Sequence, residues 1–321
     1  MEQEMKYIYT VYRTGSFSEA AKELFLTQPA LSIAVSKAEA RIGMPLFDRS
    51  RRPLALTAAG EAYIEKYEAI RALEKDLEMQ LNDLSGLKTG ALRIGGSHYI
   101  ISHILPPYLA SFSEKYPGIS LELAEAGADS LLAMLSDHAI DLTFNCEEDP
   151  EERFLRIPCF TDHILLAVPG SLAIPEQPAS AALTGSDILA GRHLRRDCPT
   201  VSVSHFADLP FVILTPGNGL HDRALEVFAE AGISPKIRLM AGQLTTCFHL
   251  CEAGLGASFV PDRLVKRADA GMLFFRIDSP HTVRHFDLVL PKNRYISNAV
   301  KAFTSHMTDA APSPHPLIEA E

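Results

Sequence analysis

The residues with the clearest chemical potential lie between positions 27 and 52, where hydrogen-bond donors and arginines are clustered. Amide, hydroxyl and ammonium groups can donate to base edges or phosphates, guanidinium groups suit phosphate oxygens, and an isoleucine can pack on a thymine methyl group. The candidates are Thr27, Gln28, Pro29, Ser32, Ile33, Ser36, Lys37, Arg49, Arg51 and Arg52. These residue types together indicate a surface that contacts DNA.

A helix that begins after Thr27 must position most of these side chains. The Thr27 hydroxyl can cap the helix, and Pro29 is tolerated in the first turn, where its missing N–H would have no partner. Four apolar residues recur at spacings of four, three and four and so share one buried face: Leu31, Val35, Ala38 and Ile42. The opposite face is small and polar. The alternative is an ordinary helical hairpin with a solvated charged loop.

A longer pattern runs through residues 16–60. It comprises Ala20-Ala21, Leu24, Thr27–Ser32, Glu39, Gly43–Arg49, Leu56-Thr57 and Gly60. This pattern resembles the N-terminal winged helix-turn-helix of the LysR-type transcriptional regulators. The resemblance implies a helix in the major groove of double-stranded DNA, a wing whose arginines bind phosphates, and an inverted-repeat operator. Many relatives carry a long polar side chain at the position of Ile33, so specificity is expected to depend on DNA shape.

The composition is typical of a soluble globular protein, with 47% hydrophobic and 22% charged residues among 321. Residues 1–58 contain eight Lys and Arg and six Asp and Glu, so their net charge is +2, whereas the whole chain carries −10. No signal segment and no long apolar run is evident, which predicts a cytoplasmic protein without membrane contact. Five cysteines without a signal segment favour reduced thiols.

A long helix is expected after the winged domain, because residues 61–85 contain neither glycine nor proline. Its apolar residues recur every three or four positions, as in a coiled-coil seam: Tyr63, Tyr67, Ile70, Leu73, Leu77, Leu81 and Leu84. A single helix cannot bury such a stripe on itself. The pattern therefore predicts a homodimer or homotetramer, and packing against the chain's own C-terminal part is the alternative.

Short strands and helices alternate from residue 91 onwards, which predicts an α/β fold with a mainly parallel sheet. Single elements are expected at 91–96 (strand), 100–116 (helix), 140–144 (strand) and 296–306 (helix). This part resembles the two-lobed, periplasmic-binding-protein-like effector domain of the LysR-type regulators. The predicted divisions are a winged helix-turn-helix at 1–58, a linker and dimerisation helix at 59–88, an effector domain at 89–306 and a disordered tail at 307–321. Lobe I would comprise about 91–161 and 269–306, and lobe II about 162–268, with 175–205 as a surface insertion of no assigned role.

A small-molecule effector is expected beyond the carboxyl ends of the strands, near helix N-termini that suit an anion. Ser97, with His98 and Tyr99 beside it, follows the first strand of this region. The facing lobe offers Thr215 after one strand, and Gln243, Thr245 and Thr246 at the start of the next helix, where the family commonly has effector-binding hydroxyls. After the second strand of the first lobe the family often has a Ser or Thr; this chain has Ala128 there, and Ser130 is the substitute. The full set of candidates is Ser97, His98, Tyr99, Ser130, Thr215, Gln243, Thr245 and Thr246. Asp129 would oppose an anionic effector if it pointed inward.

Two other functions are compatible with parts of this sequence. Redox sensing through Cys198, Cys247 and Cys251 is one alternative. An α/β small-molecule binder or enzyme with a vestigial DNA-binding head is the other. No P-loop, HExxH or GxSxG pattern is present, and Cys247 and Cys251 lack further ligands at zinc-like spacing. The sequence therefore predicts no enzymatic activity, no cofactor and no metal.

Overall fold

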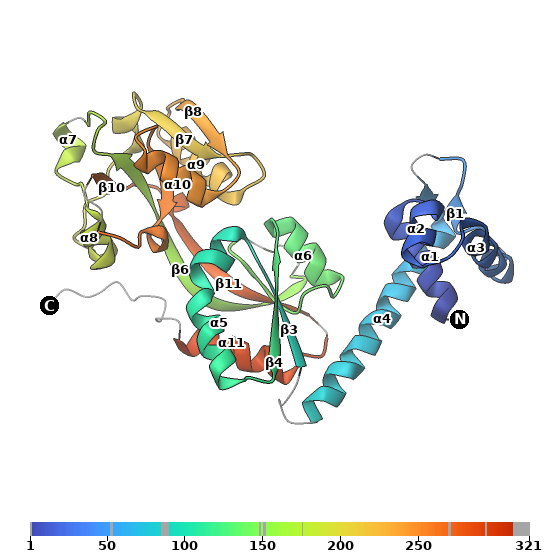
Figure 1. Cartoon of the computed structure of the whole chain (residues 1–321). Coiled ribbons are helices and arrows are strands. Elements are labelled where there is room, and N and C mark those ends of the chain that lie inside the picture. The colour runs from blue at the N-terminus through green and yellow to red at the C-terminus, as the bar shows by residue number, and fades with distance from the viewer. Residues whose placement is uncertain are drawn as a thin grey trace. The chain divides into compact units, whose positions relative to one another are not determined.

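The computed structural model describes residues 2–51, 54–84, 90–147, 149, 152–174, 176–268, 271–292 and 294–310 (Figure 1). The chain forms two compact units, Met1–Leu81 and Asn82–Glu321. Each unit has buried side chains of its own. Among the described residues, no helix combines the length and the apolar character that crossing a membrane requires.

The first unit is a small helical domain with a two-stranded wing. Its elements are α1 (Glu2–Thr14), α2 (Phe17–Glu23), α3 (Gln28–Ile42), β1 (Phe47–Asp48), β2 (Ala55–Leu56) and the first part of α4 (Ala58–Leu84). The core includes Leu31, Val35 and Ala38 of α3, which confirms the predicted buried face. Gly60 allows α4 to approach the wing closely, because a Cβ there would lie 2.1 Å from the carbonyl oxygen of Leu46.

Helix α4 carries the predicted apolar stripe. Tyr67 is buried, but further along the helix Leu73 is 69% exposed, Leu77 55% and Leu81 58%. Within a single chain the described part of the stripe is therefore left open to solvent beyond Tyr67. The predicted linker extends to residue 88, and residues 85–89 lie outside the described part of the chain.

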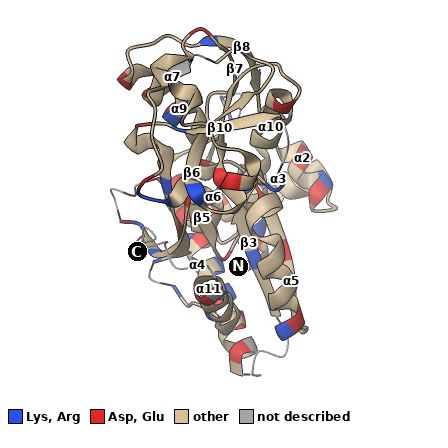
Figure 2. Ribbon diagram, turned by 90° about the vertical axis from the view of Figure 1, so that its left-hand side faces the viewer, with Lys and Arg blue, Asp and Glu red and all other residues tan. Residues whose placement is uncertain are grey.

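The second unit consists of two α/β lobes. Lobe I contains β3 (Gly90–Gly96), the π-helical turn Ile100–Ile104, α5 (Pro106–Lys115), β4 (Ile119–Glu125), α6 (Ala128–Ser136), β5 (Thr143–Asn145), β11 (Val283–Pro291) and α11 (Asn298–Ala310). Lobe II contains β7 (Pro210–Leu214), α9 (Gly219–Glu230), β8 (Lys236–Ala241), α10 (Leu244–Glu252), β9 (Ser258–Pro261) and β10 (Met272–Arg276). Acidic and basic residues are mixed over this unit in the view of Figure 2.

Strand β6 (Phe154–Pro169) belongs to both lobes (Figure 1). It pairs with β11 over Phe154–His163 and then with β9 and β10 over Ile164–Pro169. All of these pairings are antiparallel, as is β11 with β5, whereas β3–β4 and β7–β8 are parallel. The expected parallel pairing is therefore found in β3–β4 and β7–β8, which the parallel bridges Ile94–Leu142 and Phe211–Ala257 extend, but not around β6, which is antiparallel to each strand beside it.

Several predicted bounds also differ. The helix expected at 100–116 is divided, because Pro106 and Pro107 lack the N–H groups that a continuous helix needs there. The lobe boundary expected near 161/162 lies close to the point where β6 passes from β11 to β9, between His163 and Ile164. Helix α11 continues to Ala310 with Met307 fully buried, so residues 307–310 are helical and not part of a disordered tail. Residues 311–321 lie outside the described part of the chain.

The 175–205 segment is more than a surface insertion. It contains α7 (Glu176–Ala179), α8 (Gly185–Leu189) and the 3-10 turn Arg192–Leu194. Leu183 forms a bridge with Phe274 of β10, and Val201 forms a bridge with Ile277. Leu183, Ile188 and Cys198 are buried in the core of this unit. The segment is thus an integral layer of lobe II.

Candidate functional site

The outer face of α3 presents the predicted DNA-contacting residues. Thr27 caps the helix, and its Oγ1 accepts a hydrogen bond from the N–H of Ala30 at 3.4 Å. Ile33 is 57% exposed, while Ser32 is half-buried. The remaining candidates on this helix are exposed: Gln28, Pro29, Ser36 and Lys37. The face is free of bulky charged side chains other than Lys37, so a duplex can approach it closely.

The wing is attached to α3 through Arg49. Its guanidinium donates to Ser36 Oγ at 3.2 Å and to Glu39 Oε2 at 3.0 Å, and it lies over the ring of Phe17 at 5.1 Å. Arg51 pairs with Asp48 at 3.3 Å and is otherwise exposed. Arg52 lies outside the described residues. Arg49 is thus already engaged within the domain, whereas Arg51 remains exposed.

Glu39 connects the same two elements. Its Oε1 accepts hydrogen bonds from the backbone N–H groups of Leu46 at 2.8 Å and Phe47 at 3.3 Å. Both of these residues are buried, so their amides depend on this carboxylate. In the sequence, Glu39 stands out only as part of the family pattern, because residue spacing does not predict that the loop containing Leu46 and Phe47 folds back onto it.

In lobe I the predicted effector residues follow two parallel strands. Strands β3 and β4 run side by side in register, so their carboxyl ends lie at one edge. Ser97 follows β3 directly, and its Oγ accepts a hydrogen bond from the N–H of Ile100 at 3.5 Å. Ser130 lies in the first turn of α6 after β4 and is exposed, as is Asp129. The Ser130 hydroxyl, which could donate to an anionic effector, and the Asp129 carboxylate, which would repel it, therefore both lie in the first turn of α6.

Lobe II repeats this arrangement. Strands β7 and β8 are parallel, and the N–H of Thr215, after β7, donates to the carbonyl of Ala241 at 3.0 Å. Gln243 is the N-cap residue of α10 and is exposed, and Thr246 in the first turn is exposed as well. Hydroxyl and amide groups thus gather at the carboxyl ends of both parallel pairs.

Two contacts join the lobes near these edges. His103 Nε2 and Thr245 Oγ1 lie 3.2 Å apart, and Arg223 approaches Glu147 at 3.5 Å. Burial, and then the neighbouring His98, lower the pKa of His103, so its ring is favoured in the neutral form. Thr245 is therefore occupied by a partner from the other lobe in this arrangement.

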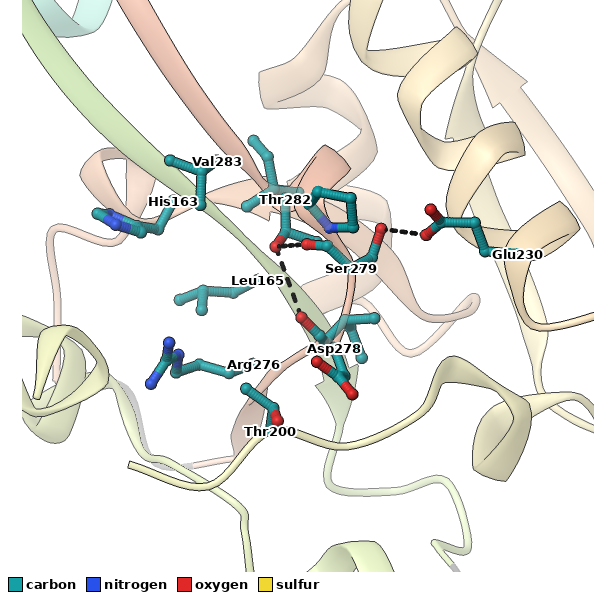
Figure 3. Close-up of a pocket in the computed structure, with 12 residues that line it drawn as sticks. His163, Leu165, Thr200, Glu230, Arg276, Asp278, Ser279, Thr282 and Val283 are labelled. Atoms are coloured by element: carbon teal, nitrogen blue, oxygen red, sulfur yellow. Dashed lines mark hydrogen bonds between the residues drawn. The ribbon is translucent and has the colours of Figure 1, made fainter. Parts of the chain in front are cut away.

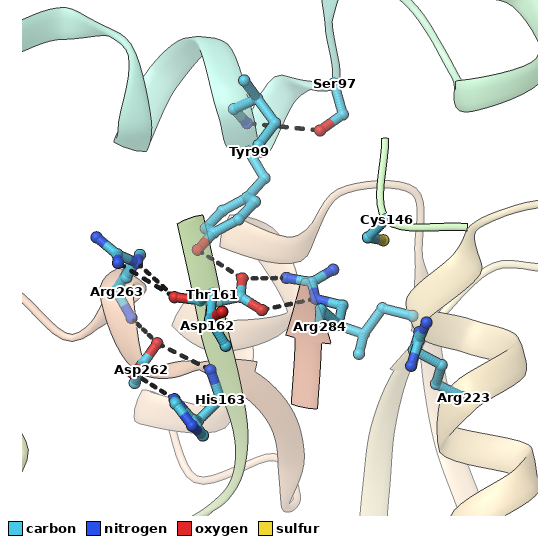
Figure 4. A network of polar contacts seen from close by, with 12 residues as sticks. Ser97, Tyr99, Cys146, Thr161, Asp162, His163, Arg223, Asp262, Arg263 and Arg284 are labelled. Atoms are coloured by element: carbon cyan, nitrogen blue, oxygen red, sulfur yellow. Dashed lines mark hydrogen bonds and ion pairs between the residues drawn. The ribbon is translucent and has the colours of Figure 1, made fainter. Parts of the chain in front are cut away.

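A buried polar network lies beneath Ser97 (Figure 4). Arg284 donates to both carboxylate oxygens of Asp162, at 2.9 and 2.6 Å, and the Tyr99 hydroxyl donates to the same group at 3.0 Å. All three residues are buried, and Asp162 is fully so. Burial, and then the Asp162 charge, raise the pKa of Tyr99 well above its ordinary value. The predicted residue Tyr99 is thus engaged in the core, and His98 contacts Glu125 at 3.3 Å instead of lying free.

Two pockets lie near the crossing of the lobes. One, of about 610 Å³, is lined by His103, His163, His193, Asp262, Arg263 and Lys266, among others. Burial alone would raise the pKa of Asp262, but contacts with His163 and His193 hold it well below its usual range. The second, of about 590 Å³, is shown in Figure 3; there Ser279 donates to Glu230, and Thr282 donates to the carbonyl of Ser279. Neither pocket was expected from the sequence.

Comparison with known protein families identifies both units. The family described as bacterial regulatory helix-turn-helix protein, lysR family, matches residues 3–61, and the LysR substrate binding domain matches residues 85–312. The chain belongs to the LysR family of transcriptional regulators. It is therefore a DNA-binding regulator with an effector-binding domain, as the resemblance implied.

Individual LysR proteins are similar over nearly the whole chain. The HTH-type transcriptional regulator YcgK of Bacillus subtilis (strain 168) is 30% identical over 299 residues, which is 93% of this chain and 91% of the relative. The crystal structure of CbnR superposes with a TM-score of 0.62 at 20% identity, covering 98% of this chain and all of the other. Full-length CbnR in complex with its target DNA gives a TM-score of 0.61 at 20% identity, covering 97% and 100%. These structures share the fold of this LysR protein.

We predict that Glu39 holds the wing in place. Glu39→Ala should lower the free energy of unfolding of the first unit by about 2–3 kcal/mol, because two buried amides and Arg49 lose their acceptor. Differential scanning calorimetry of the full chain would resolve the transition of this unit. The control Glu19→Ala removes an exposed carboxylate paired with Lys22 and should change stability by less than about 0.5 kcal/mol. Equal stability of the two variants would contradict the prediction.

Proposed function

We propose that this LysR protein binds an inverted-repeat operator as a dimer or tetramer and senses a small, anionic effector between the lobes of its second unit. The observation that carries the proposal is the placement of hydroxyl and amide groups at the carboxyl ends of β3–β4 and β7–β8. Each pair is followed by helix starts, whose free N–H groups favour negative charge. The exposed carboxylates of Glu125 and Asp129 restrict where such a charge can sit.

On the DNA side, we assign base and phosphate contacts to the exposed donors of α3, and packing against a thymine methyl group to Ile33. Arg51 is assigned to a phosphate, together with Arg52 of the same loop. Arg49 has a different role: because it is engaged with Glu39 and Ser36, it positions the wing against α3. The DNA-contacting set is thus Thr27, Gln28, Pro29, Ser32, Ile33, Ser36, Lys37, Arg51 and Arg52.

The exposed stripe of α4 supports self-association. Leucines that are more than half exposed at regular spacing would be covered by the same helix of a second chain. Two heads related by a two-fold axis would then read two half-sites of opposite direction. This geometry is why we assign an inverted-repeat operator.

In the second unit we assign effector binding to residues of both lobes. Ser97 is the first choice, because it follows β3 and is only partly buried. The other assigned residues are Ser130, Thr215, Gln243, Thr245 and Thr246. Because the relatives are transcriptional regulators, we assign this unit a sensing role rather than catalysis. We also assign the protein to the cytoplasm, where the DNA that it binds is located.

Redox sensing is less well supported than effector binding. Cys247 and Cys251 are fully buried on α10, and burial raises the pKa of Cys247 to about 11 and that of Cys251 to about 12. Since the thiolate is the reactive form, these thiols are poor nucleophiles at neutral pH. Cys198 is buried as well.

We predict that Lys37 contributes a phosphate contact. Lys37→Ala should weaken binding to the DNA upstream of the gene that encodes this protein. It should also reduce the steepness of the plot of log affinity against log salt concentration by about 1. Arg49→Ala should weaken binding as well, but should also destabilise the first unit. Fluorescence anisotropy at several salt concentrations measures both effects, with Lys236→Ala of β8 as a control of equal charge change. An unchanged salt slope for Lys37→Ala would remove Lys37 from the interface.

We predict that Ser97→Ala abolishes effector binding. A screen of small organic acids, amino acids and inorganic anions against the full chain should find a ligand that raises the melting temperature. At 100 times its Kd such a ligand should raise it by about 5–10 °C. The rise should disappear in Ser97→Ala and persist in Ser305→Ala, which removes an exposed hydroxyl of α11. A ligand whose effect survives Ser97→Ala would bind elsewhere.

We predict that the thiols of α10 resist alkylation. With a pKa raised to about 11, Cys247 should react with iodoacetamide at pH 7 at least about 100-fold more slowly than in the unfolded chain. Because the raised pKa keeps the thiol protonated, the rate should rise with pH well beyond neutrality. Mass spectrometry of peptides at timed quenches measures the rate. Fast labelling of Cys247 or Cys251 in the folded chain would favour the redox alternative.

A further inference from the structure

Three side chains from distant parts of the second unit meet beside the larger pocket. His163 lies on β6, His193 on the 3-10 turn of the 175–205 segment, and Asp262 directly after β9. His193 Nε2 is 2.9 Å from Asp262 Oδ2, and His163 Nδ1 is 3.5 Å from the same oxygen. All three ligand atoms lie within 4.8 Å of one another. We propose that His163, His193 and Asp262 bind one divalent transition-metal ion such as Zn²⁺.

The donor set and its dimensions fit such an ion. Two imidazole nitrogens and one carboxylate oxygen are ligands of zinc and of other late first-row metals. With metal–ligand bonds of about 2.0–2.1 Å in a tetrahedral arrangement, neighbouring ligand atoms are about 3.3 Å apart. The two observed distances to Asp262 Oδ2 differ from this value by only a few tenths of an ångström. The nitrogens of His163 and His193 lie within 4.8 Å of each other, so the imidazole rings would turn toward the ion on binding.

The Asp262 carboxylate of this site is already fixed in position by hydrogen bonds, without an ion. Asp262 Oδ1 accepts hydrogen bonds from the backbone N–H groups of His163 at 3.2 Å and Arg263 at 2.8 Å. These bonds fix the carboxylate of Asp262 beside His163 (Figure 4), and Oδ2 remains within 3.5 Å of His163 Nδ1 and 2.9 Å of His193 Nε2. His193 is only 3% exposed. Among the described residues, the buried Nδ1 of His163 makes no hydrogen bond, so it is available as a ligand.

Three protein ligands leave one tetrahedral position open. The 610 Å³ pocket borders all three residues, and Arg263 and Lys266 line it as well. Water or a small anion can occupy the fourth position there, with the two cations nearby. The proposal also assigns a role to the 175–205 segment, because it delivers His193 to strands β6 and β9.

The test uses the untagged, full-length chain with Zn²⁺ and Co²⁺ as probes. Isothermal titration calorimetry should give one Zn²⁺ per chain, and Co²⁺ should produce the visible absorption of a four-coordinate nitrogen and oxygen site. His193→Ala and Asp262→Asn should each weaken binding by at least about 100-fold. His281→Ala is the matched control: it removes a histidine that contacts Glu226 and Glu230 through opposite ring nitrogens and should bind the metal normally.

Folding is checked separately from binding. The melting temperature of wild type should rise on adding Zn²⁺, whereas that of Asp262→Asn, which retains the size of the side chain, should not. Absence of stoichiometric binding by a folded wild-type chain would overturn the proposal. So would unchanged affinity in both ligand variants, or a sulfur-to-cobalt charge-transfer band, which would assign the metal to cysteines.

Discussion

The crossing of β6 between the lobes is the constraint on which the second unit depends. At that point β6 stops pairing with β11 and starts pairing with β9, and Asp162 and Arg284 form a buried ion pair across the last β6–β11 positions. The Tyr99 hydroxyl adds a contact from the segment after β3. Removing one partner of such a buried pair typically costs about 3–5 kcal/mol, a large share of the stability of a whole domain.

This crossing also explains where the candidate sites lie. Because Tyr99 is anchored on Asp162, the neighbouring Ser97 is held at the carboxyl end of β3. On the other side of the same strand, His163 follows Asp162 and points toward Asp262 (Figure 4). Alternation of side chains along a strand thus directs adjacent residues to different surroundings. Strand β6 therefore supports both candidate sites. Asp162 anchors the segment that carries Ser97, whereas His163 lines the pocket of about 610 Å³.

The parts predicted from the sequence are those fixed by nearby residues. The cap at Thr27 and the spacing of Leu31, Val35 and Ala38 all lie within a few helical turns of one another, and the structure confirms the helix that they predict. The antiparallel pairing of β6 could not be predicted, because a run of apolar residues does not indicate the direction of a strand. Likewise, His193 and Asp262 are 69 residues apart and follow no ligand motif. Only the folded chain brings them together, and the same holds for Arg284 and Asp162.

The contacts between the lobes limit how an effector can act. A ligand shifts a conformational equilibrium only by binding one arrangement more tightly than another. The His103–Thr245 and Arg223–Glu147 contacts both span the lobes, so any relative rotation must break or remake them. A ligand that competes for Thr245 therefore favours a different lobe arrangement from one that binds Ser97 alone. His163 is the last residue of β6 that pairs with β11, whereas His193 and Asp262 belong to lobe II. An ion bound by these three residues would therefore tie lobe II to the crossing point of β6.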